Sequence, residues 1–169
     1  MWDVANLLLQ KTPSDNFTAT MKLTFTPNQK NKGERTGLIV MGRDYAGLFL
    51  ENTDKGLTLS QVECKRADKG KPEQSNASVS LTQNTVYLKV KFKCDGKKIK
   101  ASEGGHDLLV MCDFSYSLDG KKYQPLGNPF QAREGQWIGT KIGTFCTRPA
   151  IVTNDGGWVD VDWFRIAKK

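Results

Sequence analysis

The sequence predicts an all-β protein built as a two-sheet antiparallel jelly-roll sandwich, and three observations support this. Helical periodicity is almost absent, whereas short stretches of β-forming residues recur about every ten residues between Gly, Asn, Asp and Pro. These stretches are too many for one open sheet with an exposed apolar face, so two sheets must stack. The chain has 169 residues, 38% of them hydrophobic, which is enough for one such domain over residues 1–169.

The individual strands follow from alternating side chains and turn residues. Residues 17–26 alternate apolar with polar side chains, which predicts a strand with one buried and one exposed face. Arg43 and Asp44 separate two apolar runs and predict a hairpin between 37–42 and 46–51, and Asp119-Gly120 is a second hairpin signal. The other predicted strands are residues 6–11, 57–64, 77–81, 86–92, 108–118, 123–126, 137–146 and 158–167. Residues 94–105 are expected to form a Lys- and Gly-rich insertion.

The alternation also predicts the core and one irregularity. In the last strand the apolar positions 159, 161 and 163 are followed by 164 and 166, which predicts a β-bulge near Asp162 and Trp163. The side chains expected in the core are Phe17, Ala19, Met21, Leu23, Phe25, Leu38, Val40, Leu48, Leu50, Val86, Leu88, Val90, Phe114, Tyr116, Ile142 and Phe164.

The charge is positive but spread along the chain. There are 25 Lys and Arg residues against 18 Asp and Glu, a formal net charge of +7, and the lysines stand mostly beside Gly, Asn or Asp in expected turns. No interleaving of aromatic with basic residues is visible, so no nucleic-acid partner is expected. The apolar runs are far shorter than a membrane helix and no signal segment opens the sequence. No membrane partner is therefore expected, and the localisation stays open.

Few residues offer catalytic or metal-binding chemistry. The sole histidine, His106, lies in a Gly-rich stretch, and the four cysteines form no C-x-x-C pair, so neither a nucleophilic triad nor a zinc site is expected. The cysteines are predicted to be free thiols, and no cofactor is required. Asp160 and Asp162, two positions apart on one strand, could supply oxygen ligands to one structural Ca²⁺. The alternative is an ordinary polar face, with an aspartate bonded to a neighbouring turn or arginine.

Aromatic side chains are the other candidates, because flat rings stack on the apolar faces of sugars. Trp137 follows the polar turn 133–136 and precedes Gly139, which places its ring at a sheet edge. Tyr45, in the hairpin after Arg43 and Asp44, is expected in a similar position. The alternative for Trp137 is a core tryptophan at the start of a strand.

Seven stretches are specific in combination and span nearly the whole chain, namely Asn6–Lys11, Phe17–Thr20, Gly33–Leu38, Met41–Ala46, Phe114–Gly120, Trp137–Gly139 with Gly143, and Asp160–Arg165. Together they resemble the C-terminal concanavalin A-like β-sandwich of family 43 glycoside hydrolases, a module that accompanies β-xylosidases and arabinofuranosidases. The resemblance implies that the catalytic carboxylates sit on a separate five-bladed propeller, so no catalytic residue is assigned to this chain. Members of the family usually begin with a further tryptophan-containing segment upstream of the position of Trp2, so the chain is interpreted as a module excised from a larger hydrolase.

The resemblance also implies a role for one loop. In the family, a loop aromatic just before a Gly-x-x-x-Gly pattern reaches into the propeller's pocket, and here Trp137 precedes Gly139 and Gly143. This chain departs from the family at Gly47, where an aromatic is common, and at the insertion 95–105.

The leading functional hypothesis is a non-catalytic accessory module of a xylan-degrading enzyme. It would bind xylan or xylo-oligosaccharide, or complete a β-xylosidase active site on the propeller domain, through Trp137, Tyr45, Asp44 and Arg43. One alternative is a purely structural domain that supports the propeller without binding sugar. The other, a complete small hydrolase, is disfavoured because no acid/base pair is recognisable in the sequence.

Overall fold

The computed structural model describes residues 6–101, 106–135, 138–149 and 155–168, and almost all of its regular structure is β-strand. One short 3-10 helix, η1, spans Ala67–Lys69. The strands are β1 (Leu7–Lys11), β2 (Phe17–Thr26), β3 (Arg35–Met41), β4 (Tyr45–Thr53), β5 (Gly56–Cys64), β6 (Gln74–Ser80), β7 (Thr85–Lys100), β8 (His106–Ser117), β9 (Gln124–Pro125), β10 (Phe130–Ala132), β11 (Lys141–Thr147) and β12 (Trp158–Lys168).

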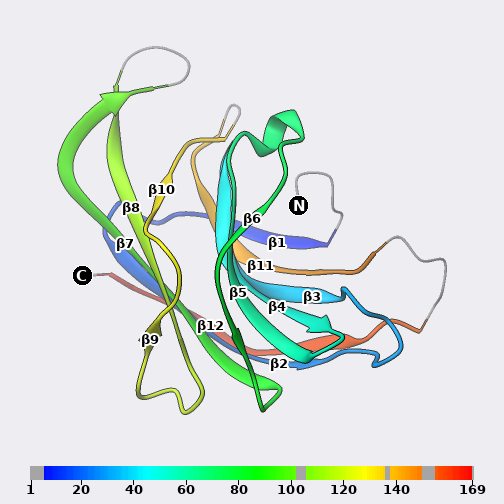
Figure 1. The fold of residues 1–169 in the computed structure, drawn as a ribbon. Coiled ribbons are helices and arrows are strands. Elements are labelled where there is room, and N and C mark those ends of the chain that lie inside the picture. Colours follow the sequence, from blue (N-terminus) through cyan, green and yellow to red (C-terminus); the bar gives the residue numbers. More distant parts are fainter. Residues whose placement is uncertain (1–5, 102–105, 136–137, 150–154, 169) are drawn as a thin grey trace.

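The strands form two antiparallel sheets that stack on one another (Figure 1). Sheet A has the order β1-β11-β3-β4-β5-β6, and sheet B has the order β10-β8-β7-β2-β12 with β9 paired to β8. The chain crosses between the sheets several times, so strands distant in sequence, such as β1 and β11, become neighbours. The predicted two-sheet sandwich is therefore confirmed.

The main core lies between the two sheets. β2 is buried at every second position, in agreement with its alternating sequence. All the side chains predicted for the core are buried except Phe164, which is partly buried and packs against the others. Each fully buried Leu, Ile, Phe or Met side chain contributes about 1.5–3 kcal/mol, so this layer is the main source of stability.

A second buried cluster, which the sequence analysis did not anticipate, covers the other face of sheet A. Tyr45, Phe49 and Phe145 are at most 2% exposed there, and the rings of Phe49 and Phe145 lie 4.5 Å apart. The other buried members are Ile39, Val62, Cys64 and Ala67. The centre of sheet A, at β3 and β4, is thus buried on both faces, whereas sheet B has one buried face.

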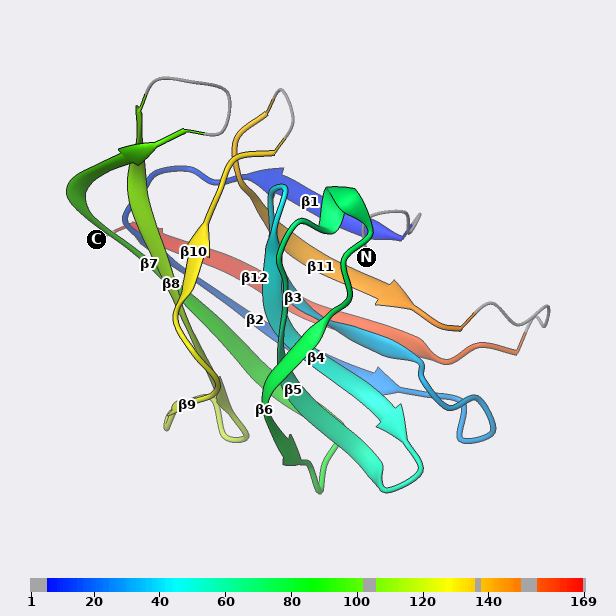
Figure 2. The same cartoon turned by 45° about the horizontal axis from the view of Figure 1, so that its top comes forward.

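Several local expectations can be compared with the strands. The bulge predicted near Asp162 is confirmed, since the register between β12 and β2 shifts between Val161 and Trp163. The expected insertion at 94–105 is corrected in part, because β7 continues to Lys100 across a register shift between Cys94 and Lys98. The β7–β8 hairpin consequently projects beyond the other strands (Figure 2).

The end of the chain also differs from expectation in detail. β10 was not predicted, and β11 begins at Lys141 instead of at residue 137. The four cysteines are free, as predicted. None of the described segments is a helix long and apolar enough to cross a membrane.

Candidate functional site

The connection between β10 and β11, here called the 133–140 loop, carries the predicted sugar-contacting residue Trp137. Residues 136 and 137 lie outside the described residues, so the site is built from the two stems of this loop. The stems bond to each other: the Gly135 N–H donates to the Ile138 carbonyl at 2.7 Å, and the Thr140 hydroxyl donates to the Arg133 carbonyl at 2.8 Å. The two stems of the loop are therefore hydrogen-bonded to each other, and the loop connects sheet B to sheet A.

The β3–β4 hairpin packs against the first stem of this loop through its backbone. The Arg43 N–H donates to the Glu134 carbonyl at 3.0 Å. At Gly42 a Cβ would come within 1.9 Å of the Arg133 carbonyl oxygen, so only glycine allows the two backbones to lie this close. The hairpin and the loop are thus in direct backbone contact.

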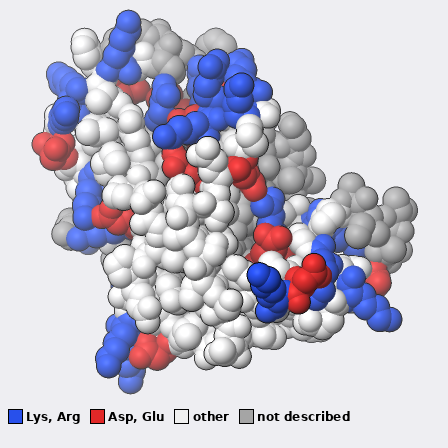
Figure 3. Space-filling view, in the orientation of Figure 1, with Lys and Arg blue, Asp and Glu red and all other residues white. Residues whose placement is uncertain are grey.

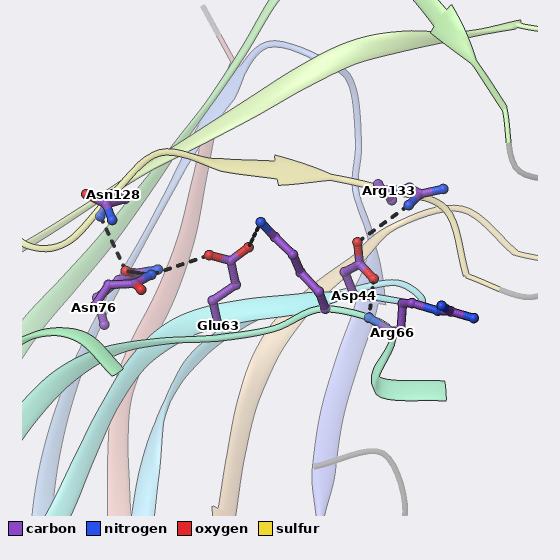
Figure 4. A network of polar contacts seen from close by, with 8 residues as sticks. Asp44, Glu63, Arg66, Asn76, Asn128 and Arg133 are labelled. Atoms are coloured by element: carbon purple, nitrogen blue, oxygen red, sulfur yellow. Dashed lines mark hydrogen bonds and ion pairs between the residues drawn. The ribbon is translucent and has the colours of Figure 1, made fainter. Parts of the chain in front are cut away.

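Asp44 connects the same stem to a second loop. One carboxylate oxygen accepts a hydrogen bond from the Arg66 backbone N–H at 2.7 Å, and the other lies 3.7 Å from the Arg133 guanidinium (Figure 4). The Arg43 carbonyl accepts a further bond from the Ala67 N–H at 2.9 Å. With 6% of its surface exposed, Asp44 acts as a positioning residue for the two loops. Sugar binding by Arg43 or Asp44 stays a prediction.

A line of polar side chains continues from this point along β5. Gln61, which is fully buried, accepts hydrogen bonds from the Asn76 side chain at 2.8 Å and from the Asn128 N–H at 3.3 Å. Asn76 also donates to Glu63 at 3.4 Å, and Lys65 lies 3.4 Å from the same carboxylate (Figure 4). The network therefore connects the β9–β10 segment to sheet A.

A cleft of about 400 Å³ opens beside the 133–140 loop. Its polar lining includes Thr12, His106, Asp107, Glu134 and Thr140. Burial, together with the charge of Glu134 and a hydrogen bond to it, raises the pKa of Asp107 above its ordinary value. The volume lies within the range of small-ligand pockets, and the hydroxyl and carboxyl groups offer hydrogen bonds of the kind that sugar hydroxyls form.

The surface around η1 is rich in basic side chains. Figure 3 shows Lys and Arg side chains gathered over η1, next to a broad area without charged groups. The basic side chains in and next to η1 are Lys65, Arg66 and Lys69. An anionic or polyhydroxylated partner would meet favourable charge at this end.

The structure corrects the expected position of Tyr45. We expected its ring at a sheet edge, but β4 lies inside sheet A, and Tyr45 is only 2% exposed. Its hydroxyl donates to Glu73 at 2.6 Å, and burial, followed by that contact, raises its pKa far above the ordinary value. The hairpin composition indicated a turn correctly, but it could not show that the outer face of sheet A is covered.

The two aspartates proposed as calcium ligands are exposed side chains of β12. Asp162 lies 3.4 Å from the Lys22 ammonium. Within the described ranges, no group of three or more His, Cys, Asp or Glu side chains could hold a metal ion. Two exposed carboxylates, one of them next to an ammonium, do not match the six to eight oxygen ligands of Ca²⁺. The described residues therefore do not fit a calcium site.

Comparison with known proteins places this geometry in a family. The model of the β-xylosidase C-terminal concanavalin A-like domain matches residues 1–167. The chain belongs to this family. None of the curated proteins matches it.

Solved structures with the same fold include several family 43 proteins. A bifunctional GH43-CE protein of Bacteroides eggerthii aligns with a TM-score of 0.75 and 24% identity, over 98% of this chain and 19% of that chain. The xylan β-1,4-xylosidase of Bacillus halodurans aligns with a TM-score of 0.70 and 18% identity, over 96% of this chain and 29% of that one. BlXynB of Bacillus licheniformis aligns with a TM-score of 0.68 and 19% identity, over 97% of this chain and 30% of that one.

These comparisons confirm the resemblance read from the sequence. This domain, the concanavalin A-like module of family 43 hydrolases, spans less than a third of each of these chains. It is the non-catalytic C-terminal module of such enzymes. Sequence reasoning found the module and its loop but missed the contacts of Arg133 and Glu134, because lone charged residues in a short turn carry no signal of their partners.

Proposed function

We propose that this module completes a sugar-binding site on a family 43 catalytic propeller, with the 133–140 loop supplying the aromatic contact at Trp137. The observation that supports this proposal is the anchoring of the loop. A loop that presents one side chain to a ligand should already be held in place before binding. Conformational entropy that the loop loses on binding would otherwise lower the affinity.

Three contacts anchor the first stem of the loop. Backbone contact at Gly42, the hydrogen bond from Arg43 to Glu134 and the ion pair of Asp44 with Arg133 all act on the first stem. The adjoining cleft of about 400 Å³ leaves space for a sugar ring beside the loop. The alternative, a purely structural support for the propeller, needs the domain but not a precisely held loop.

Replacement of Trp137 by Ala tests the proposal in the isolated module. We expect affinity for xylo-oligosaccharide to fall by about 2 kcal/mol, roughly thirtyfold, because a central stacked ring behaves as a hot spot. Stability should change little. Calorimetric titration with a short neutral xylo-oligosaccharide measures the first quantity and urea denaturation the second. A loss of about 3–5 kcal/mol in unfolding free energy would instead identify a core tryptophan and end the ligand assignment.

Trp158→Ala is the matched control, since Trp158 is 59% exposed on β12 and lies outside the loop. It should leave binding unchanged. In the two-domain enzyme, Trp137→Ala should lower kcat/KM for an aryl xyloside, and an unchanged value would favour the purely structural role. Arg133→Ala should weaken binding in the same direction but less, because it loosens the loop without removing the ring.

A further inference from the structure

The outer face of sheet B brings together aromatic and basic side chains that are far apart in the sequence. Lys22 of β2 stands between Trp163 of β12 and Tyr87 of β7 in the strand register. In the next row, Thr20 stands between Arg165 and Lys89. Figure 1 shows β12, β2 and β7 side by side. Aromatic and basic residues do not interleave along the sequence; strand pairing brings them together on this face.

The side chains in this group contact one another. The Arg165 guanidinium lies 4.4 Å from the centre of the Trp163 ring, and the Lys89 ammonium lies 3.2 Å from the centre of the Tyr123 ring. The rings of Tyr87 and Trp163 are 6.1 Å apart. We call this group the aromatic–basic face, and it comprises Lys22, Tyr87, Lys89, Tyr123, Trp163 and Arg165.

The two stacked cations keep their charge available to a ligand. Neither Lys89 nor Arg165 forms an ion pair with a carboxylate of the described residues, whereas Lys22 is paired with Asp162 at 3.4 Å. An Arg guanidinium offers a planar fork that matches a carboxylate, and a Lys ammonium offers three donors. The remaining outward positions of β2 are threonines, which can bond hydroxyl groups.

The chemistry of this face selects its ligand class. Half-buried rings pack against the apolar faces of sugars, and cations set beside those rings pair with a carboxylate on the same chain. A nucleic acid carries a charge on every nucleotide and needs several cations in line. Among the described residues of the aromatic–basic face, Lys89 and Arg165 have no ion pair and alternate with rings and threonines, which suits sparse charge on a sugar polymer. Further along β7, Lys93 is already paired with Asp113. We propose that the aromatic–basic face of sheet B binds an anionic glycan, a xylan chain that carries uronic acid groups.

This site is separate from the 133–140 loop and does not depend on it. The face belongs to β2, β7 and β12 and to Tyr123 before β9, and none of its members lines the cleft beside the loop. Trp137→Ala should therefore leave binding at the aromatic–basic face intact. A negative result at the 133–140 loop would therefore not count against the aromatic–basic face, nor the reverse.

Affinity electrophoresis with two forms of one polysaccharide tests the proposal. We expect the module to bind glucuronoxylan about tenfold more tightly than the same xylan after its carboxyl groups are reduced, which is the effect of one good charge-assisted contact. The double variant Lys89→Ala/Arg165→Ala should lose that preference. The matched control is Lys30→Ala/Lys55→Ala, which removes the same charge from exposed sites elsewhere and should keep it.

Three outcomes would overturn the proposal: equal affinity for the native and the carboxyl-reduced xylan, equal loss of affinity in both double variants, and tighter binding of a single-stranded oligonucleotide than of glucuronoxylan. Trp163→Ala should weaken binding of both xylan forms because it removes the stacking surface. Thermal unfolding of each variant verifies the fold. The charge variants decide the question even where Trp163→Ala is unstable.

Discussion

The two sheets of this module differ most on their outer faces. On sheet A the outward side chains at the centre of the sheet form a second buried, mainly apolar cluster around Tyr45, Phe49 and Phe145. On sheet B the outward side chains are threonines, lysines and partly exposed rings. The central strands of sheet A are thus buried on both faces, whereas the outer face of sheet B is open to solvent and to ligands.

The local sequence of the strands predicts this difference between the two sheets. β3 and β4 read as continuous apolar runs, RTGLIVM and YAGLFLENT, whereas β2 and β7 alternate polar with apolar residues. A strand buried on both faces needs no polar side, and a strand with one solvated face needs every second residue polar. Continuous and alternating runs therefore indicate which sheet is covered twice.

The rim of the outer cluster on sheet A contains an ion pair, formed by Glu73 and Arg35. Glu73 accepts hydrogen bonds from the Tyr45 hydroxyl and from the Arg35 guanidinium, both at 2.6 Å. The Arg35 guanidinium also lies 5.4 Å from the centre of the Phe49 ring. Polar atoms at this apolar boundary are thus paired with one another, as burial requires.

The comparison predicts its largest effect at Phe49. Phe49→Ala should lower the free energy of unfolding by about 3–5 kcal/mol, because it removes a buried ring from the covered face. Tyr87→Ala on the outer face of sheet B is the matched aromatic truncation and should cost no more than about 1.5 kcal/mol. Urea denaturation of both variants measures the difference. Equal losses would mean that the two outer faces do not differ in their contribution to stability.

A smaller effect is expected from Glu73→Gln, about 1–3 kcal/mol near neutral pH, because the charge-assisted bonds to Arg35 and Tyr45 are weakened. Burial alone would raise the pKa of Glu73, but the hydrogen bonds from Arg35 and Tyr45, with the charge of Arg35, hold it below the ordinary value. The unfolded chain therefore binds a proton at a higher pH than the folded one. The carboxylate contributes its full stability above its ordinary pKa and loses it as pH falls through the lower, folded pKa.

The pH dependence of unfolding checks this directly. The stability difference between the native sequence and Glu73→Gln should stay constant near neutral pH and shrink as the pH falls below about 4. Glu51→Gln, at a partly exposed position of strand β4 in the same sheet, serves as the carboxylate control and should show a much smaller difference at every pH. A difference for Glu73→Gln that grows on acidification would contradict the assignment.

Lys22→Ala should have a smaller effect, within about 0.5 kcal/mol, because its ion pair with Asp162 is solvent-accessible on sheet B. The measurement is again urea denaturation, with and without added salt. A loss above about 1.5 kcal/mol would show that the outer face of sheet B contributes to stability as sheet A does.

Removal of divalent metal should have the smallest effect. Asp160 and Asp162 are exposed and do not fit a calcium site with the other described residues, so a chelator should leave the thermal unfolding curve unchanged. A bound ion would raise the melting temperature by mass action. A chelator-dependent drop of the melting temperature, absent in Asp160→Asn, would restore the calcium assignment.

Much of the fold and little of the site could be predicted from the sequence. β2 has the predicted bounds Phe17–Thr26, and the bulge at Asp162 is visible as a break in alternation. β10 has only three residues, too short a run for any periodic signal. Tyr45 was misplaced because its hairpin shows turn chemistry and nothing about what covers the strand that follows.

Local sequence determined the elements, the two-sheet class and the family, since alternation, turn residues and a set of specific stretches are properties of neighbouring residues. Only the tertiary structure decided which residues meet across strands. Lys22 lies between Trp163 and Tyr87, and Asp44 reaches Arg133, through pairings that join positions more than sixty residues apart. A strand's pattern states which face is apolar, but its neighbours depend on the global packing of both sheets.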